Sequence, residues 1–157
     1  MNSESIPEYK IILASNSSIR QKILEDSGIS FEVVPSEVEE EELKQSLSGN
    51  NFREYCLTLA KAKALDVSNK KKNAYVIGSD QICCYGEEIF SKPLTKENCF
   101  KTLSKLSGNT HYQNCGISIC KNGKEIWSHY AQAALTMKSL SDTEIRAVLI
   151  FFFIIIY

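Results

Sequence analysis

Residues 75–93 read YVIGSDQICCYGEEIFSKP. They begin with an apolar run that indicates a buried strand, and the run leads into a carboxylate, Asp80. A carboxylate just past a buried strand lies at the carboxyl edge of a sheet, where α/β proteins place their ligands. Lys92 follows, directly before Pro93. Two interpretations stay open: a strand end followed by a surface loop, or a metal–phosphate site.

The segments that precede this strand alternate between strand and helix signals. Residues 9–15 (YKIILAS) and 31–36 (FEVVPS) are short apolar runs, typical of buried strands. Apolar residues at helical spacing predict helices over residues 19–28 and 52–67. Strands and helices that alternate in this way indicate an α/β fold.

The C-terminal half carries turn and capping signals. The elements expected there are a helix over 96–106, strands over 110–120 and 125–137, and a short final helix. Thr95 is a good N-cap for the first of these helices. Asn122 and Gly123 are typical of a tight hairpin turn between the two strands. Ser141 and Glu144 have the capping-box spacing that begins the final helix. With a hairpin added to alternating elements, the predicted sheet is mixed.

Composition fits one soluble domain that covers residues 1–157, with 43% hydrophobic and 24% charged residues. The net charge of −1 provides no general attraction for nucleic acid or for an anionic membrane. The six cysteines form no C-x-x-C pair, and two histidines are too few for zinc-site spacing. Residues 1–10 contain no apolar signal-peptide core. We therefore expect a reduced, cytoplasmic protein whose cysteines pack as small apolar side chains.

The loop after the first expected strand is a candidate phosphate site. It reads LASNSSIRQK and opens a helix, whose free amide groups and positive potential attract phosphate. Ser15 lies at this helix start, and Arg20 lies one turn further on, where its guanidinium could reach the same anion. Ordinary serine capping is the competing explanation.

Two further charged features have alternative explanations. Five glutamates fill six positions from Glu37 to Glu42, either as a solvated acidic face or as oxygen ligands for Mg²⁺. Lys63 shares a helical face with apolar residues. A lysine in that setting either extends its ammonium group to solvent or reaches across a cleft to a phosphate.

The polar residues of the opening segment complete the candidate set. Asp80 is suited to hold a metal ion or to take a proton from an attacking water molecule, and both roles need an ionised carboxylate. Gln81 offers an amide that can read the edge of a nucleobase. Lys92 is suited to neutralise charge on phosphate groups. The P-loop, G-x-G-x-x-G and G-x-S-x-G patterns are absent from the sequence.

Seven short motifs, taken in order over residues 9–149, resemble the Maf family of nucleoside triphosphate pyrophosphatases, also called septum formation proteins. The matching residues are LASNS at 13–17, Glu39-Glu40, LAKAKA at 59–64, IGSDQ at 77–81, SKP at 91–93, LSGNTH at 106–111 and LSD at 140–142. Each motif is weak alone, and the order of all seven makes the resemblance specific.

The resemblance implies hydrolysis of a nucleoside or deoxynucleoside triphosphate, non-standard or modified bases included, to the monophosphate and pyrophosphate with Mg²⁺ or Mn²⁺. It implies a Maf/ITPase-like curved mixed sheet flanked by helices, with an active-site cleft between lobes. From the net charge we expect no nucleic-acid or membrane partner, and a homodimer stays open. The roles that the resemblance implies are catalysis for Asp80, a metal site for Glu40 and Asp80, and substrate binding for Ser15, Arg20, Lys63, Gln81 and Lys92.

Three departures from the family pattern bear on activity. Ile19 replaces the first arginine of the family's SPRR motif, and Asn114 stands where many members have threonine. The family pattern is lost after residue 149, and the chain ends in an atypical apolar run over 150–157, which suggests a truncated C-terminus or a buried strand. Two alternatives follow: a truncated, non-catalytic relative that binds nucleotide or regulates cell division, or a peripheral membrane protein anchored by residues 151–156.

Overall fold

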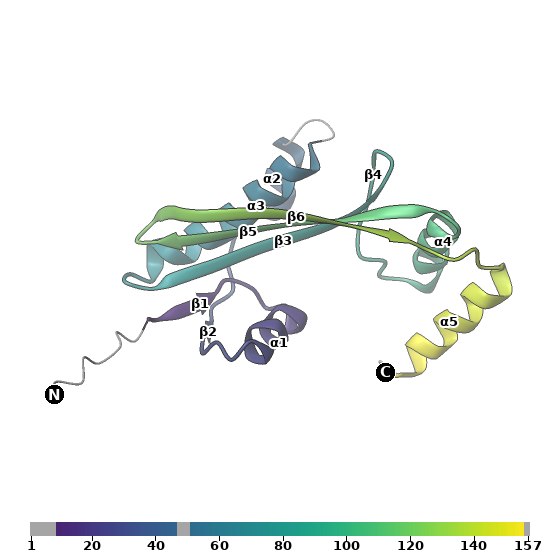
Figure 1. Cartoon of the computed structure of the whole chain (residues 1–157), viewed down its shortest axis with the longest axis horizontal. Helices are drawn as coiled ribbons and strands as arrows, with labels where there is room; N and C mark the ends of the chain where they lie inside the picture. Colours follow the sequence, from purple (N-terminus) through teal and green to yellow (C-terminus); the bar gives the residue numbers. More distant parts are fainter. Residues whose placement is uncertain (1–8, 47–50, 156–157) are drawn as a thin grey trace. The chain divides into compact units, whose positions relative to one another are not determined.

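The computed structural model describes residues 9–46 and 51–155, and the side chains of 9–43 and 51–150 (Figure 1). The strands are β1 (Ile11–Leu13), β2 (Glu32–Val33), β3 (Tyr75–Tyr85), β4 (Glu88–Phe90), β5 (Thr110–Lys121) and β6 (Lys124–Thr136). The helices are α1 (Ser18–Asp26), α2 (Glu40–Ser46), α3 (Phe52–Lys70), α4 (Lys96–Leu106) and α5 (Asp142–Ile155).

The strands form one mixed sheet in the order β2-β1-β3-β5-β6, and β4 pairs with β3 outside this path. β1 is parallel to both β2 and β3, whereas β4 is antiparallel to β3. A turn with positive φ at Asn122 and Gly123 connects β5 to β6, as expected of a tight hairpin. The predicted α/β class with a mixed sheet is therefore confirmed.

The chain forms two compact units. Unit 1 consists of Met1–Gln81 and Cys115–Ala131, and unit 2 consists of Ile82–Asn114 and Gln132–Tyr157. The chain passes from one unit to the other within β3, β5 and β6, so neither unit is a contiguous stretch of sequence. The expectation of a single domain over residues 1–157 stays a prediction.

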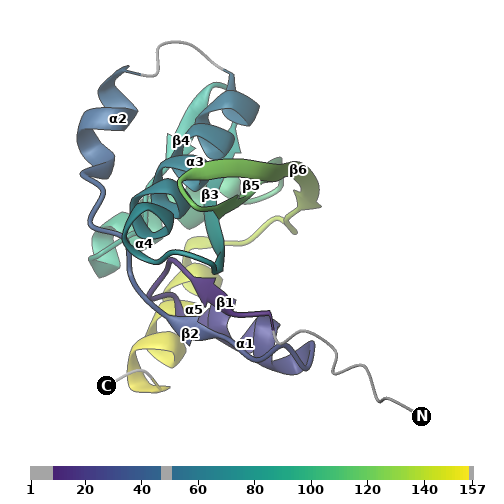
Figure 2. The same cartoon turned by 90° about the vertical axis from the view of Figure 1, so that its left-hand side faces the viewer.

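Unit 1 is built on the packing of α3 against the sheet, which can be followed in Figures 1 and 2. Its central apolar cluster consists of Ile12, Ala14, Ala64, Val67, Ala74, Val76 and Cys120. Two glycines, Gly78 on β3 and Gly116 on β5, meet backbone atoms of α3 so closely that a Cβ atom would not fit at either position. The helix that carries Lys63 is thus held directly against the strand that carries Asp80.

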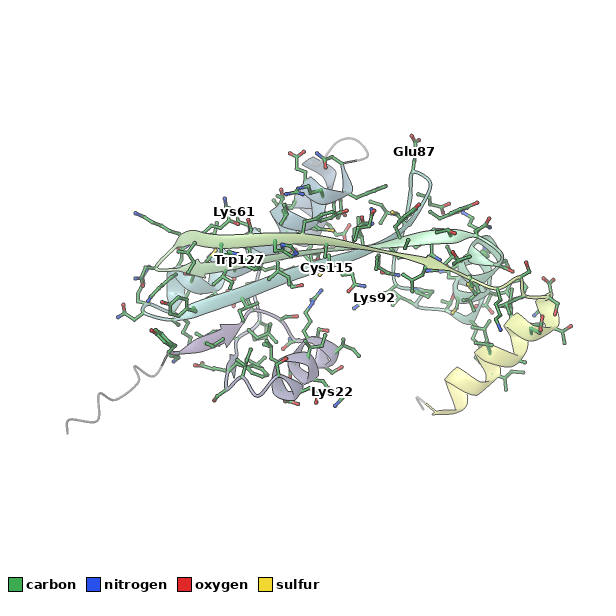
Figure 3. The ribbon with its side chains drawn as sticks, in the orientation of Figure 1. Lys22, Lys61, Glu87, Lys92, Cys115 and Trp127 are labelled. Atoms are coloured by element: carbon green, nitrogen blue, oxygen red, sulfur yellow. The ribbon has the colours of Figure 1, made fainter. Side chains whose placement is uncertain are left out.

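Unit 2 contains the packed helices α4 and α5. Leu106 of α4 is buried, as are Ile145 and Leu149 of α5. The guanidinium carbon of Arg146 lies 4.6 Å from the centre of the Phe100 ring, a cation–π contact between the two helices. The turn between β3 and β4, with Glu87 at its tip, also belongs to this unit (Figure 3).

The C-terminal apolar run corrects one expectation. A buried strand over the final residues is wrong, because α5 continues to Ile155. The capping box that begins this helix is confirmed: Ser141 N–H donates to Glu144 Oε2 at 2.7 Å, and Glu144 N–H donates to Ser141 Oγ at 3.3 Å. Most of residues 1–10, on which the signal-peptide expectation rests, lie outside the described part of the chain. The side chains of residues 151–156, the proposed membrane anchor, also lie outside it.

Candidate active site

Lys63 is the centre of a buried ionic cluster in unit 1. It lies on the face of α3 that packs against the sheet, and its neighbours on that face are fully buried. Its Nζ donates to Asp80 Oδ1 at 2.8 Å and lies 2.9 Å from Glu40 Oε1. Because only 7% of Lys63 is exposed, the interpretation that its ammonium group extends to solvent is wrong.

Asp80 lies inside β3, which continues to Tyr85, so the expectation that it follows the end of the strand is wrong. It is 7% exposed, whereas the next residue, Gln81, is exposed. Successive side chains of a strand point to opposite faces, so the two predicted site residues face in opposite directions. A buried carboxylate is costly unless a cation or hydrogen-bond donors compensate its charge, and Lys63 provides that compensation here.

Glu40 is the first residue of α2, and three glutamates occupy the first turn of this helix. Carboxylates are favoured there by the positive end of the helix dipole. Glu40 is half-buried against Lys63, whereas its neighbour Glu39 is exposed. Of the two acidic residues that matched the family motif, the structure brings Glu40 into the cluster.

The donor chemistry of this cluster fits a hard divalent cation. Glu40 and Asp80 supply carboxylate oxygens, the ligands that Mg²⁺ and Mn²⁺ prefer, and both reach the same ammonium group. A site of this kind also takes oxygens from substrate phosphates and from water. Within the described residues, no group of three or more His, Cys, Asp and Glu side chains converges on one point. The described part of the chain therefore offers two carboxylates to a cation, and the remaining ligands would come from substrate and water.

Ser15 and Arg20 are brought together at the start of α1. Arg20 Nη1 donates to Ser15 Oγ at 3.1 Å, and the backbone N–H of Ser17 donates to the same oxygen at 3.2 Å. Ser17 occupies the N-cap position but makes no side-chain hydrogen bond to the first turn, which contains no acidic residue. Simple serine capping therefore does not describe this helix start, and its positive potential is not offset locally.

Lys92 is the one predicted site residue in unit 2. It lies, exposed, in the segment between β4 and α4 (Figure 3). This segment lines a pocket of about 520 Å³ together with residues of β4 and α4, and the volume is within the size range of small-molecule sites. Lys92, Phe90 and Phe100 are among the residues that line it.

A second link fixes α3 to the hairpin of β5 and β6. Lys61 Nζ lies 2.9 Å from Glu125 Oε2, and the buried Ser118 donates its hydroxyl to Glu125 Oε1 at 2.9 Å. Burial raises the pKa of Glu125, but the hydrogen bonds from Lys61 and Ser118 outweigh it and hold the pKa below its ordinary value. Glu125 therefore accepts these bonds as an ionised carboxylate at neutral pH.

Sequence reasoning missed the roles of two neighbours of Asp80, Ser79 and Gly78. Ser79, the preceding residue, is buried, and its Oγ lies 3.8 Å from the Sγ of Cys115 on β5. Gly78 allows the close approach of α3. A glycine inside an apolar strand pattern is a signal for a close backbone approach, and it could have been read from residues 75–80.

Comparison with known proteins finds relatives over most of the chain. A family model described as Maf-like protein matches residues 10–150. A nucleoside triphosphate pyrophosphatase of Legionella pneumophila (strain Corby) is 40% identical over 147 residues, which are 94% of this chain and 74% of the relative. A 7-methyl-GTP pyrophosphatase of Mesorhizobium japonicum is 40% identical over 133 residues, which are 83% and 67% of the two chains.

A solved structure resembles the fold. The structure of a HAM1 protein from Coxiella burnetii has a TM-score of 0.51 and 19% sequence identity, and the match covers 81% of this chain and 71% of that protein. At this identity the likeness concerns the fold alone. In the described part of the chain, no helix has both the length and the apolar composition that a membrane crossing requires.

Proposed function

This chain belongs to the family of Maf-like proteins, and on that premise we propose that it is a nucleoside triphosphate pyrophosphatase, a hydrolase that converts a nucleoside triphosphate to the monophosphate and pyrophosphate. The observation that carries the proposal is the buried Lys63 held between Asp80 and Glu40. A cluster of buried charges is typical of active sites, because burying charge is costly and a stable fold does not require it.

In the proposed reaction, a water oxygen attacks the α-phosphorus and the bond to the oxygen that bridges the α- and β-phosphates breaks. Pyrophosphate leaves with that oxygen, and Asp80 takes a proton from the attacking water. Lys63 holds the carboxylate of Asp80 in position through their 2.8 Å contact before the substrate arrives. When the triphosphate is bound, the same ammonium group is placed to meet its negative charge.

Phosphate binding is proposed for Ser15, Arg20 and the amide groups at the start of α1. Arg20 presents a guanidinium that already contacts Ser15, and guanidinium groups bind phosphate oxygens in pairs. Gln81 and Lys92 stay predicted substrate contacts, and their support is the family resemblance. The role of Lys92 is also supported by the pocket that it lines in unit 2.

We propose Mg²⁺ or Mn²⁺ as the cofactor, held by Glu40 and Asp80. When bound, such a cation neutralises phosphate charge and lowers the pKa of coordinated water. Glu40 is half-exposed, so it can turn from Lys63 to a cation without unfolding the helix that carries it. The proposal also places the enzyme in the cytoplasm, where free thiols such as its six cysteines stay reduced.

The base is a separate question, and 7-methyl-GTP is a specific candidate. Relatives at 38–40% identity are named 7-methyl-GTP pyrophosphatases, and those at 40% identity from Legionella pneumophila carry the general name. A methylated guanine is cationic, and aromatic rings attract cations through their faces. The assay of this chain therefore needs GTP and 7-methyl-GTP side by side.

The first test is pyrophosphate release from standard and modified nucleoside triphosphates with Mg²⁺ or Mn²⁺. We expect turnover of at least one of them and a loss of about 100-fold or more in Asp80→Asn, because a proton acceptor contributes 10²–10⁴-fold. Asp26→Asn is the control: it is an exposed carboxylate at the end of α1 that pairs with Lys22 and not with Lys63. It should retain activity within about threefold of the wild type.

Either of two results would contradict the proposal. One is a folded wild-type protein that turns over none of the nucleotides. If that protein still bound them, the alternative of a non-catalytic nucleotide-binding relative would take its place. The other is turnover that survives in Asp80→Asn, which would remove Asp80 from the chemistry.

A further inference from the structure

Gly78 lies at the closest approach of β3 and α3. A Cβ atom at this position would lie 2.2 Å from the carbonyl oxygen of Ala60, 2.7 Å from the amide nitrogen of Ala64 and 2.9 Å from its Cβ. Real Cβ atoms essentially never come within 3.0 Å of another atom in this way. The first two contacts are backbone atoms, which cannot rotate aside as a side chain does. Any other residue at position 78 must therefore move the helix.

The same contact determines where Lys63 lies. Ala60 and Ala64 are the residues one turn before and directly after Lys63 on α3, and Asp80 lies two residues after Gly78 on β3. The clash and the ion pair thus involve the same turn of the helix and the same part of the strand. The Nζ–Oδ1 distance is 2.8 Å, and a displacement of about 1 Å takes it beyond hydrogen-bonding distance.

We propose that Gly78 is a positioning residue for the reaction. Its missing side chain sets the separation of α3 from β3 and thereby holds the ammonium group of Lys63 on Asp80. This inference rests on the proposed function and deepens it, because it names a residue that touches no substrate and acts through Lys63. A misplacement of about 1 Å at a remote residue can lower the rate by about 100-fold.

The chain contains a matched control for this contact. Gly116 on β5 meets the same helix, and a Cβ atom there would lie 2.5 Å from the backbone carbon and oxygen of Cys56. The steric conflict is of the same kind and again involves backbone atoms. Cys56 precedes Lys63 by two turns of the helix, about 10 Å along its axis. Gly116→Ala therefore disturbs the packing of α3 at a distance from the ion pair.

The experiment compares Gly78→Ala and Gly116→Ala in the full chain by two readouts. The first is kcat for the best substrate of the nucleotide panel, measured where circular dichroism shows both variants folded. The second needs no substrate: it is the coupling free energy between Lys63 and Asp80, from denaturant unfolding of Lys63→Met, Asp80→Asn and the double variant in each glycine background.

We expect Gly78→Ala to lower kcat by at least about tenfold and to remove more than half of the coupling between Lys63 and Asp80. Gly116→Ala should change kcat by less than about threefold and leave the coupling intact. A general loss of packing would instead affect both variants alike. If the wild type turns over no nucleotide, the coupling free energy still tests whether Gly78 positions Lys63 on Asp80. Failure of the proposed function can therefore be distinguished from failure of this inference.

Two results would overturn the inference: equal effects of the two substitutions, or coupling that is retained in Gly78→Ala, whether or not kcat falls. If Gly78→Ala does not fold, Ala64→Ser takes its place in both measurements. The Cβ atom of Ala64 is part of the same contact, and the substitution adds a single oxygen to that atom. The same expected and contradicting results then apply.

Discussion

At the scale of single residues, Lys63 and Lys61 differ sharply although they lie two positions apart on α3. Lys63 is buried between two carboxylates, whereas the side chain of Lys61 is 47% exposed and pairs with one. Lys63→Met should lower the free energy of unfolding by about 3 kcal/mol, because it leaves the charge of Asp80 buried and uncompensated. Lys61→Met should cost at most about 1 kcal/mol. Urea unfolding of both variants measures the difference.

A double variant separates this charge effect from lost packing. Lys63→Met combined with Asp80→Asn removes both charges and should recover a large part of the stability. Equal losses in Lys63→Met and Lys61→Met would show that the buried cluster is not the reason for the effect.

The sequence allowed these residues to be predicted singly but not as a cluster. Lys63 was visible as a lysine on an apolar face, Asp80 as a carboxylate after a buried strand, and Glu40 as part of an acidic run. The ion pairs join positions far apart in the chain, and they depend on how closely α3 approaches β3 at Gly78. Such distances depend on tertiary packing, and the spacing of apolar residues in the sequence does not predict them.

At the scale of elements, the link from α3 to the β5–β6 hairpin predicts a pH dependence. The folded-state pKa of Glu125 is lowered, so its stabilising effect is fully present above the unfolded value, about 4.3, and is lost as the pH falls through the folded value. Glu125→Gln should therefore destabilise the protein at neutral pH, and its difference from the wild type should shrink below about pH 4. Unfolding free energies between pH 7 and 3 test this.

A difference between Glu125→Gln and the wild type that stays constant over that range would contradict this account. Ser118→Ala offers a second check, since it removes one donor to the carboxylate and leaves Lys61 in place. It should reduce the pH dependence without abolishing it.

Elements with regularly spaced apolar residues or a helix-capping residue could be predicted from the sequence. Elements that lack both signals could not. Thr95 begins α4 as expected, and its Oγ1 accepts from the N–H of Asn98 at 3.1 Å. Helix α2 went unrecognised because its glutamates give no apolar period. At α5 the β-branched and aromatic residues suggested a strand, but the capping box starts a helix that continues through them. Local start signals outweighed intrinsic strand preference there.

At the scale of the whole molecule, the apolar core is concentrated in unit 1. Its cluster includes Ile12, Ala64 and Val76, each fully buried. Among the side chains that the structure describes, unit 2 buries fewer apolar residues, and its helices α4 and α5 are largely exposed. We expect the amides of α3 and of the first half of β3 to exchange with deuterium more slowly than those of α4.

Hydrogen exchange followed by mass spectrometry measures this directly. Equal protection of α3 and α4 would indicate that both units open together in one cooperative step and would contradict the expected order.

The passage of the chain between the units within three strands has a consequence for how such a protein can change over generations. Each unit is assembled from two stretches of the gene that alternate with those of the other unit. No single recombination event can exchange one whole unit for that of a relative. Three junctions would be required, each in the middle of a strand, and the first falls directly after Asp80 and Gln81. The two units are therefore inherited as one block, and their sequences must adapt to each other by point mutation.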